Sequence, residues 1–346
     1  MTTDTQRDGI ILLAKKPGIT SFTALNSVKK ALNTSKVGHT GTLDSFAEGL
    51  LVVCTGRLTK LAGNITEFDK TYDAVIKFGE ETDTLDYTGT IVKKASLPSK
   101  EALQEAVEAF RGPLMQEPPS FSAIHVNGKR ASDLAREGQT TAIPPRPIQV
   151  YESEIRDLLF SKDDDKKVSF ALIRFTVSKG TYIRSLARDI AKAAGSAAHL
   201  VGLFRSRIGN FSIENAAGFS SLENFSISSA IKTMEKELQK ENIVTEKKDW
   251  KNDEAENVLK EEIRRKILSF NEESAKLCGF ALLHTIDDEA VMQFKNGRPL
   301  RSNLFDISLH SLLNKSTASV FTKGGCFIGL IAKDDKGQVS YRFVLN

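Results

Sequence analysis

Cysteine is scarce in this sequence, and its few cysteines form no familiar pattern. The 346 residues include three cysteines, Cys54, Cys278 and Cys326, which lie far apart and are odd in number. The sequence contains no CxxC pair. We therefore expect neither a disulfide framework nor a structural zinc site. Such sparing use of cysteine suits a protein of the reducing cytoplasm.

Long hydrophobic runs are missing as well. Residues 1–9 are mostly polar, and the apolar run Ile10–Ala14 is too short for a signal sequence or a membrane-spanning helix. We see no internal repeat of the kind that marks solenoids or propellers. The sequence therefore predicts a cytoplasmic protein that has no membrane partner.

A large excess of one charge is also absent. Lys and Arg number 48 and Asp and Glu number 44, which gives a net charge of +4. This balance permits a polyanionic partner but does not require one, because so small an excess could hide one basic face or none. The length of 346 residues predicts about two domains. Hydrophobic residues make up 40% of the chain, as in ordinary globular proteins.

Hydrophobic periodicity predicts a mixture of strands and helices without a regular βαβ rhythm. We expect strands over Ile10–Leu13, Leu50–Cys54, Tyr72–Phe78, Phe121–Val126 and Val168–Arg174. We expect helices over Phe22–Leu32, from Ser99 to an end at Gly112, over Lys129–Arg136 and over Thr181–Ala194. This order favours an α+β fold with a mixed, mostly antiparallel central sheet flanked by helices.

Two of these helices carry recognisable end signals. Thr20 or Ser21 can cap the first helix, whose apolar stripe would be Phe22, Leu25, Val28 and Leu32. In the last helix Thr181 is the expected N-cap and Gly195 the expected C-cap.

The composition changes after about Ser229. The segment Lys232–Lys266 has 10 basic and 10 acidic residues among 35, so its charge cancels. We interpret it as an exposed helix or linker between domains. The remaining segment, Leu277–Asn346, consists of short apolar runs between glycine turns and predicts a small β-rich module.

The loop between Gly38 and Glu48 is the most informative stretch. It is rich in glycine and hydroxyl side chains and holds one histidine, His39, and one aspartate, Asp44. It is neither a phosphate-binding P-loop nor a nucleophile elbow, because neither spacing is present. On physical grounds Asp44 is either a turn former or a catalytic carboxylate held by a tight loop.

A second stretch, Ser178–Arg188, places Arg184 at the start of a helix. Positive charge is unfavourable there because of the helix dipole, so an arginine in this place needs a carboxylate or phosphate partner. The alternative is an ordinary surface arginine.

Together these stretches resemble the TruB family of bacterial tRNA pseudouridine synthases. Gly38-His39-Thr40-Gly41-Thr42-Leu43-Asp44 matches the catalytic loop of that family, and Ser178-Lys179-Gly180-Thr181-Tyr182-Ile183-Arg184 matches its second active-site motif. Further agreement comes from Lys16-Pro17-Gly18, Asp69-Lys70-Thr71-Tyr72, Thr82-Asp83-Thr84, Arg146-Pro147-Ile148 and Phe294-Lys295-Asn296-Gly297. The core of the resemblance extends from about residue 9 to about residue 213, and the ordered succession of motifs makes it specific.

The resemblance implies a function and a set of site residues. The family converts uridine 55 in the T-loop of tRNA to pseudouridine, with no cofactor or metal. Asp44 falls on its catalytic aspartate, Tyr72 on the tyrosine that stacks on the target base, and His39 on the histidine that packs in the T-loop. The remaining members of the implied site are Tyr182, Arg184, Leu203 and Arg205.

The resemblance also implies an organisation. We expect a catalytic domain over residues 1–231, a charged helical connector over 232–275 and a PUA-like RNA-binding module over 276–346. The expected partner is the T-stem-loop of tRNA, bound by a monomer. RNA binding further requires that positive side chains converge on one face, and the candidates are Lys16, Lys179, Arg184, Arg188 and Arg205.

Some residues depart from the family pattern, and other functions remain open. Ser45 stands where proline is usual, so the turn after Asp44 loses a fixed φ. Phe121 replaces a usual tyrosine and His125 a usual lysine. One alternative is an RNA chaperone whose isomerase activity is secondary or lost. Another is a glycosidase, which would need a pair of carboxylates.

We assign no role in the site to the other histidines. His199 lies in an apolar run and is expected to be a packed core histidine, whereas His284 and His310 have no partner visible in the sequence.

Overall fold

The computed structural model describes residues 8–126, 128–139, 143–241 and 254–345. Among these, nine strands form one large sheet, with the order β1-β3-β12-β4-β11-β10-β7, while β2 pairs with β3 and β13 with β12. The strands are β1 (Gly9–Lys15), β2 (Val37–His39), β3 (Glu48–Thr55), β4 (Lys70–Phe78), β7 (Gly112–Gln116), β10 (Arg146–Phe160), β11 (Val168–Val177), β12 (Ala198–Ile208) and β13 (Phe211–Ser212). All pairs are antiparallel except β12 with β3, so the predicted mixed, mostly antiparallel α+β sheet is confirmed.

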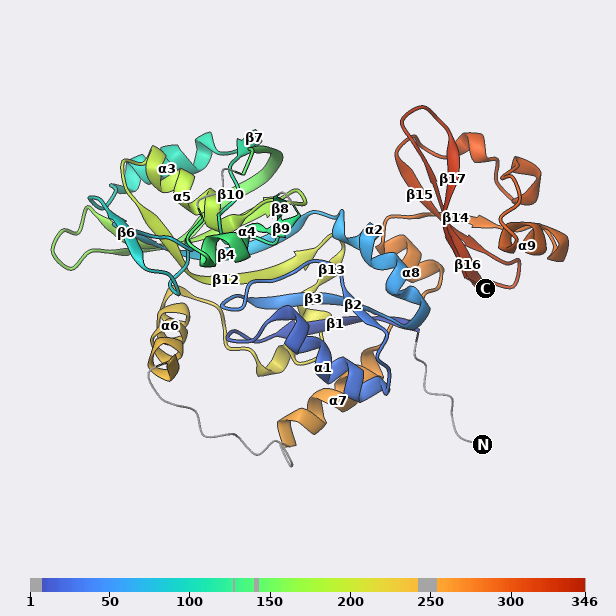
Figure 1. Cartoon of the computed structure of the whole chain (residues 1–346), viewed down its shortest axis with the longest axis horizontal. Helices are drawn as coiled ribbons and strands as arrows, with labels where there is room; N and C mark the ends of the chain where they lie inside the picture. Colours follow the sequence, from blue (N-terminus) through green and yellow to red (C-terminus); the bar gives the residue numbers. More distant parts are fainter. Residues whose placement is uncertain (1–7, 127, 140–142, 242–253, 346) are drawn as a thin grey trace.

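Helices cover both faces of this sheet. In the view of Figure 1, α3 (Lys100–Ala109) and α5 (Ile183–Ala193) lie above it, and α1 (Ser21–Leu32), α6 (Ile227–Glu241) and α7 (Glu254–Lys266) lie below. Central strands are therefore buried on both sides, as the five consecutive buried residues Tyr72–Ile76 of β4 show. Smaller elements are α2 (Ala62–Thr66), α4 (Ala131–Arg136), and the two-stranded pairs β5 (Glu80–Thr82) with β6 (Ile91–Lys94) and β8 (His125–Val126) with β9 (Lys129–Arg130).

The first helix begins at its predicted cap and buries Leu25, Val28 and Leu32 of its predicted stripe, but not Phe22. The Thr20 hydroxyl accepts a hydrogen bond from the Thr23 N–H, so Thr20 is the N-cap. Phe22 is 67% exposed, so its place in the predicted apolar stripe is wrong. Ser21 takes the inner position instead, and the Lys29 ammonium lies 4.7 Å from the centroid of the Phe22 ring.

Two further expectations fail for identifiable reasons. The predicted strand Phe121–Val126 shrinks to β8, because its backbone groups bond elsewhere: Ser132 N donates to Ser122 O and Ala131 N to Ile124 O. Thr181 does not cap α5, since Tyr182 is the N-cap residue. The helix that begins at Ser99 ends at Ala109, before Gly112 starts β7.

The charged segment is only partly an exposed linker. Its centre, residues 242–253 including Trp250, lies outside the described residues. The part that forms α7 docks on the core: Ile263 is fully buried, and Lys30 on α1 pairs with Glu256 at 2.9 Å. Arg264 Nε also donates to the Ala31 carbonyl at 2.9 Å. The segment 254–266 is thus the predicted helix and not a linker, and only its full exposure is wrong, because one face docks on the core.

The last part of the described chain forms a separate four-stranded sheet (Figure 1, orange and red). Its strands are β14 (Ala281–His284), β15 (Ser316–Phe321), β16 (Phe327–Lys333) and β17 (Val339–Val344), accompanied by α8 (Glu272–Leu277) and α9 (Asp288–Lys295). This confirms the predicted β-rich region. Among the described residues we find no helix that is both long and apolar enough to cross a membrane.

Gly49 marks the crossing point of three strands near the start of β3. It lies opposite Lys15 of β1 and beside Arg205 of β12. Its φ is +110°, and a Cβ atom there would lie 2.4 Å from the Arg205 carbonyl oxygen. Both the backbone angle and the close approach therefore require glycine.

We expect Gly49→Ala to lower the free energy of unfolding by about 2–3 kcal/mol, because both strain and a backbone clash result. Gly195→Ala is the matched control, since Gly195 has φ +72° but nothing within 4 Å of the added Cβ. It should cost only about 1 kcal/mol. Urea unfolding of both variants measures the difference, and equal losses would contradict a clash at Gly49.

Candidate active site

The loop that carries Asp44 is tied down on both sides. It connects β2 to β3, and the Ser21 hydroxyl accepts from Leu43 N at 2.8 Å and donates to Leu43 O at 2.9 Å. On the other side Gly18 N donates to the Ser45 carbonyl at 2.9 Å. The Asp44 side chain remains 37% exposed. The loop therefore presents one carboxylate to solvent from a fixed backbone.

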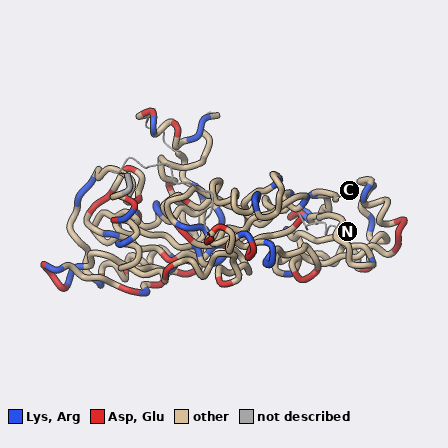
Figure 2. Tube along the Cα trace, turned by 90° about the horizontal axis from the view of Figure 1, so that it is seen from below, with Lys and Arg blue, Asp and Glu red and all other residues tan. Residues whose placement is uncertain are grey.

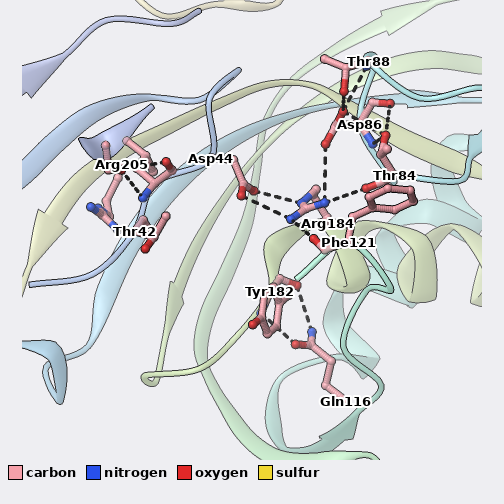
Figure 3. Close-up of polar contacts among 12 residues, drawn as sticks. Thr42, Asp44, Thr84, Asp86, Thr88, Gln116, Phe121, Tyr182, Arg184 and Arg205 are labelled. Carbon is pink, nitrogen blue, oxygen red and sulfur yellow. Dashed lines mark hydrogen bonds and ion pairs between the residues drawn. The ribbon is translucent and has the colours of Figure 1, made fainter. Parts of the chain in front are cut away.

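Arg184 lies beside this carboxylate (Figure 3). Its Nε lies 2.9 Å from Asp44 Oδ2, and its Nη2 donates to Asp44 Oδ1 at 3.3 Å. Only 6% of the Arg184 side chain is exposed. Nη1 donates to the Thr84 carbonyl at 2.8 Å and Nη2 to the Phe121 carbonyl at 3.0 Å. The predicted carboxylate partner of Arg184 is thus Asp44, and the surface-arginine alternative is wrong.

A second carboxylate, Asp86, lies on the other side of Arg184. Its Oδ2 is 3.6 Å from Arg184 Nη1, and its Oδ1 accepts from the Thr84 hydroxyl at 3.0 Å and from the Thr88 hydroxyl at 2.5 Å. Asp86 is 5% exposed. The sequence analysis did not assign this residue, although its position two residues after Thr84 of a recognised motif was an available signal.

Arg205 supports the loop from inside. Its Nε donates to the Leu50 carbonyl at 2.8 Å, its Nη1 to Thr42 O at 3.3 Å and its Nη2 to Gly41 O at 3.2 Å. It is 1% exposed. Arg205 Cζ lies 6.0 Å from the centroid of the Tyr72 ring, which faces it across the β12–β4 pair. Arg205 therefore connects the loop to Tyr72.

Tyr182, His39 and Leu203 complete the predicted set. Burial raises the pKa of the Tyr182 phenol above its ordinary 10, while the nearby Arg184 charge opposes this. Burial lowers the pKa of His39, and the charge of Arg205 adds to the effect, so the ring is neutral at pH 7. Leu203 is buried in the apolar cluster that also contains Tyr72. All the predicted residues thus gather around the loop of Asp44.

Several buried hydroxyls at this place have no hydrogen-bond partner within the described part of the chain. They belong to Thr40, Ser122, Thr181 and Ser185. Buried polar groups are nearly always paired, so an unpaired group close to a carboxylate is suited to bind a substrate or ordered water. The site can therefore offer a carboxylate and a neutral phenol to a polar ligand.

The predicted basic face does not form from the five expected side chains. Arg184 and Arg205 do converge, but as buried supports of the loop. Lys179 pairs with Glu67, and Arg188 with Asp189 at 2.8 Å. Figure 2 shows Lys and Arg interspersed with Asp and Glu along the whole trace. The expectation of a basic face made of these five side chains is wrong, because Arg184 and Arg205 are buried and bind groups inside the protein.

Lys15 is a second support that the sequence analysis missed. Its ammonium donates to the carbonyls of Lys16 at 3.0 Å, Ser45 at 3.2 Å and Ala47 at 2.6 Å, and the side chain is 1% exposed. Burial lowers the pKa of Lys15 from 10.5 to about 7, against the opposing charge of Asp44 and Glu48. Lys15 therefore holds the turn at Ser45, where the family usually has proline.

The histidines away from the loop are structural. His199 is 4% exposed, and its Nδ1 lies 2.9 Å from the Glu80 carbonyl, which confirms a packed core histidine. His284 is not without partners: its Nε2 lies 3.0 Å from Glu272 and its Nδ1 3.1 Å from Asp306. Within the described residues no cluster of three or more His, Cys, Asp and Glu side chains could hold a metal ion.

Known proteins are similar to this chain in sequence. The family model described as TruB family pseudouridylate synthase (N terminal domain) matches residues 29–183. The tRNA pseudouridine synthase B of Treponema denticola is 41% identical over 342 residues, covering 93% of this chain and 94% of that protein. The tRNA pseudouridine synthase B of Bordetella avium is 43% identical over 220 residues, covering 62% of this chain and 87% of that protein.

Solved structures give the same fold at lower identity. The chain aligns with a component of an archaeal box H/ACA sRNP Nop10-Cbf5 complex at a TM-score of 0.62 and 20% identity, over 98% of this chain and 86% of that one. A Cbf5-Nop10-Gar1 complex gives 0.63 and 22%, over 98% and 85%.

We expect Lys15→Met to lower the free energy of unfolding by about 1–3 kcal/mol, because buried carbonyls lose their donor. The pKa of Lys15 is lower in the folded protein than in the unfolded chain. Between about pH 7 and 10.5 Lys15 is therefore protonated mainly in the unfolded chain. The contribution of Lys15 to the free energy of unfolding thus rises with pH over this range. The difference between wild type and variant should therefore widen by roughly 1 kcal/mol per pH unit above pH 7. Urea unfolding at several pH values checks this, and a constant difference would contradict the lowered pKa.

Proposed function

This chain belongs to the TruB family of pseudouridylate synthases, and on that basis we propose that it converts uridine 55 in the T-loop of tRNA to pseudouridine. The observation that carries the proposal is the pairing of Asp44 with Arg184, at 2.9 Å, on a loop with the family's sequence. Most of the chain is similar to proteins named tRNA pseudouridine synthase B.

The reaction suits the chemistry of the site. Pseudouridine formation breaks the C1′–N1 bond, turns the base and forms a C1′–C5 bond, with a proton passing from C5 to solvent and N1 becoming protonated. The rearrangement is an isomerisation without change of oxidation state, so it needs no redox cofactor. One carboxylate can start it, and Asp44 is the partly exposed carboxylate of the loop.

Asp44 has two routes open to it. It attacks C1′ as a nucleophile, or it removes a proton from C2′ as a general base. In either case Arg184 orients it through two contacts, and Asp86 and the Thr84 carbonyl hold Arg184 in turn. The carboxylate therefore enters the reaction already positioned.

The remaining residues receive the flipped nucleotide. Reaching the sugar requires that the uridine leave its stack, and single-stranded loops are where RNA bases are accessible. We assign the Tyr72 ring, whose centroid lies 6.0 Å from Arg205 Cζ, to stacking on the target base. Neutral His39 packs in the T-loop, while Tyr182 and Leu203 line the pocket of the base.

A glycosidase is a weaker interpretation. Such enzymes use two carboxylates that both reach the substrate. The second carboxylate here, Asp86, is 5% exposed and lies behind Arg184, where it accepts hydrogen bonds from neighbouring threonines. It supports the arginine and does not face a ligand.

The organisation of the chain follows from the same proposal. We divide it into a catalytic domain over residues 1–231, a charged helical connector over 232–275 and a PUA-like RNA-binding module over 276–346. The enzyme acts as a cytoplasmic monomer on the T-stem-loop of tRNA. Because α6 begins at Ile227 and packs on β12, the connector starts within a docked helix.

We expect Asp44→Asn to reduce pseudouridine formation by at least about 1,000-fold, because an amide neither attacks nor accepts a proton. The assay is release of tritium from tRNA labelled at C5 of uridine, with and without uridine at position 55, because the reaction releases the C5 hydrogen to solvent. Asp164→Asn, at the exposed turn between β10 and β11, is the control and should turn over normally. Near-normal activity of Asp44→Asn would refute the catalytic role. A tRNA-refolding activity that persists while wild type forms no pseudouridine would favour the chaperone instead.

Tyr72→Ala is expected to slow single-turnover formation of pseudouridine by about 10- to 100-fold, since base stacking contributes roughly 1–3 kcal/mol. Tyr72→Phe keeps the ring and should stay within a few-fold of wild type. Equal rates for wild type and Tyr72→Ala would rule out stacking.

A further inference from the structure

Gln116 makes an unusual two-point contact with the backbone of the active site. It is the last residue of edge strand β7 and is 3% exposed. Its Oε1 accepts from Tyr182 N at 2.8 Å and its Nε2 donates to Tyr182 O at 3.0 Å (Figure 3). Both polar atoms of the carboxamide are thus used on one residue, 66 positions further along the chain.

This contact holds the residue at which α5 begins. Tyr182 is the N-cap residue of α5, yet its own side chain makes no capping hydrogen bond. The Tyr182 carbonyl also accepts the first helical hydrogen bond, from Leu186 N at 3.0 Å. Two parallel hydrogen bonds fix the direction of a backbone as well as its position. Gln116 therefore determines where α5 begins and how its first residues are oriented.

The active-site residues Tyr182 and Arg184 depend on where α5 begins. Tyr182 itself carries the phenol, and Arg184 lies two residues later, paired with Asp44. The chain that leaves β7 continues along the same helix: the Glu117 carbonyl accepts from Arg188 Nη2 at 3.2 Å, and the Phe121 carbonyl accepts from Arg184 Nη2 at 3.0 Å. Of these three contacts, the one at Gln116 comes first in the chain and has the shortest hydrogen bond, at 2.8 Å.

We propose that Gln116 is a positioning residue for pseudouridine formation, which holds the start of α5 so that Tyr182 and Arg184 meet Asp44 in the reactive arrangement. The inference rests on the proposed function. Gln116 acts through Tyr182: its side chain is 3% exposed, and both of its hydrogen bonds go to the Tyr182 backbone.

The first test is Gln116→Met, which keeps the size of the side chain and removes both hydrogen bonds. We expect the single-turnover rate constant at saturating enzyme to fall about 10- to 100-fold, with the Kd for tRNA within about threefold of wild type. A wild-type rate constant, or a loss confined to Kd, would overturn the proposal.

The second test is Gln116→Glu, which provides a pH readout. A protonated carboxyl has one donor and one acceptor, as the amide has, whereas an ionised carboxylate has no donor for the Tyr182 carbonyl. Burial beside that carbonyl raises the pKa of the introduced carboxyl. The rate of Gln116→Glu relative to wild type should therefore rise at least about fivefold between pH 8 and pH 5.5, while that of Gln116→Met stays flat.

The matched control is Ser196→Ala, at the other end of α5. The Ser196 hydroxyl is buried and donates to the Ser96 carbonyl at 2.7 Å, so its removal also costs a buried hydrogen bond. Its rate constant should stay within about twofold of wild type. An equal loss in Ser196→Ala would assign the effect to general stability and overturn the proposal.

If Gln116→Met does not fold, Gln116→Glu decides alone, and a ratio that is independent of pH overturns the proposal. All rates are taken relative to wild type. Absence of pseudouridine with wild-type enzyme would instead refute the proposed function, so the two failures are distinguishable.

Discussion

A guanidinium with only 6% of its side chain exposed must find its partners inside the protein, because an unpaired buried charge is costly. Arg184 finds two carboxylates and two backbone carbonyls. All four acceptors are far from it in sequence, and Asp44 is the one that solvent reaches. The need to satisfy one buried cation thus brings several loops together and leaves a single carboxylate facing outward.

The loop of Asp44 is organised by the same kind of interaction. Arg205 donates to carbonyls before the aspartate, and Lys15 donates to carbonyls after it. Backbone oxygens therefore point inward to the cations, while the carboxylate points outward. This arrangement also explains why net charge is a poor guide to the partner, since a share of the positive charge is used to hold the loop and does not reach the surface.

Local sequence signals were sufficient for most elements and for the loop itself. Alternation predicted β4 and β11, and the cap at Thr20 predicted the start of α1. Several of the failures involve long-range contacts. Phe22 is displaced by Ser21, whose hydroxyl binds a residue 22 positions away. Lys15 and Gln116 looked unremarkable because their partners lie 32 and 66 positions further on. No window of neighbouring residues contains that information.

One apolar cluster joins residues of the large sheet, such as Leu12 and Leu50, with Phe321, Phe327 and Leu330 of the small one. A core that two sheets share cannot be exposed on one side without damage to the other. The two sheets should therefore unfold in one cooperative transition, and the small sheet is not free to pivot as a tethered domain would be. The outer surfaces of the two sheets are therefore held at a fixed distance from each other, and a ligand that contacted both would have to match that distance.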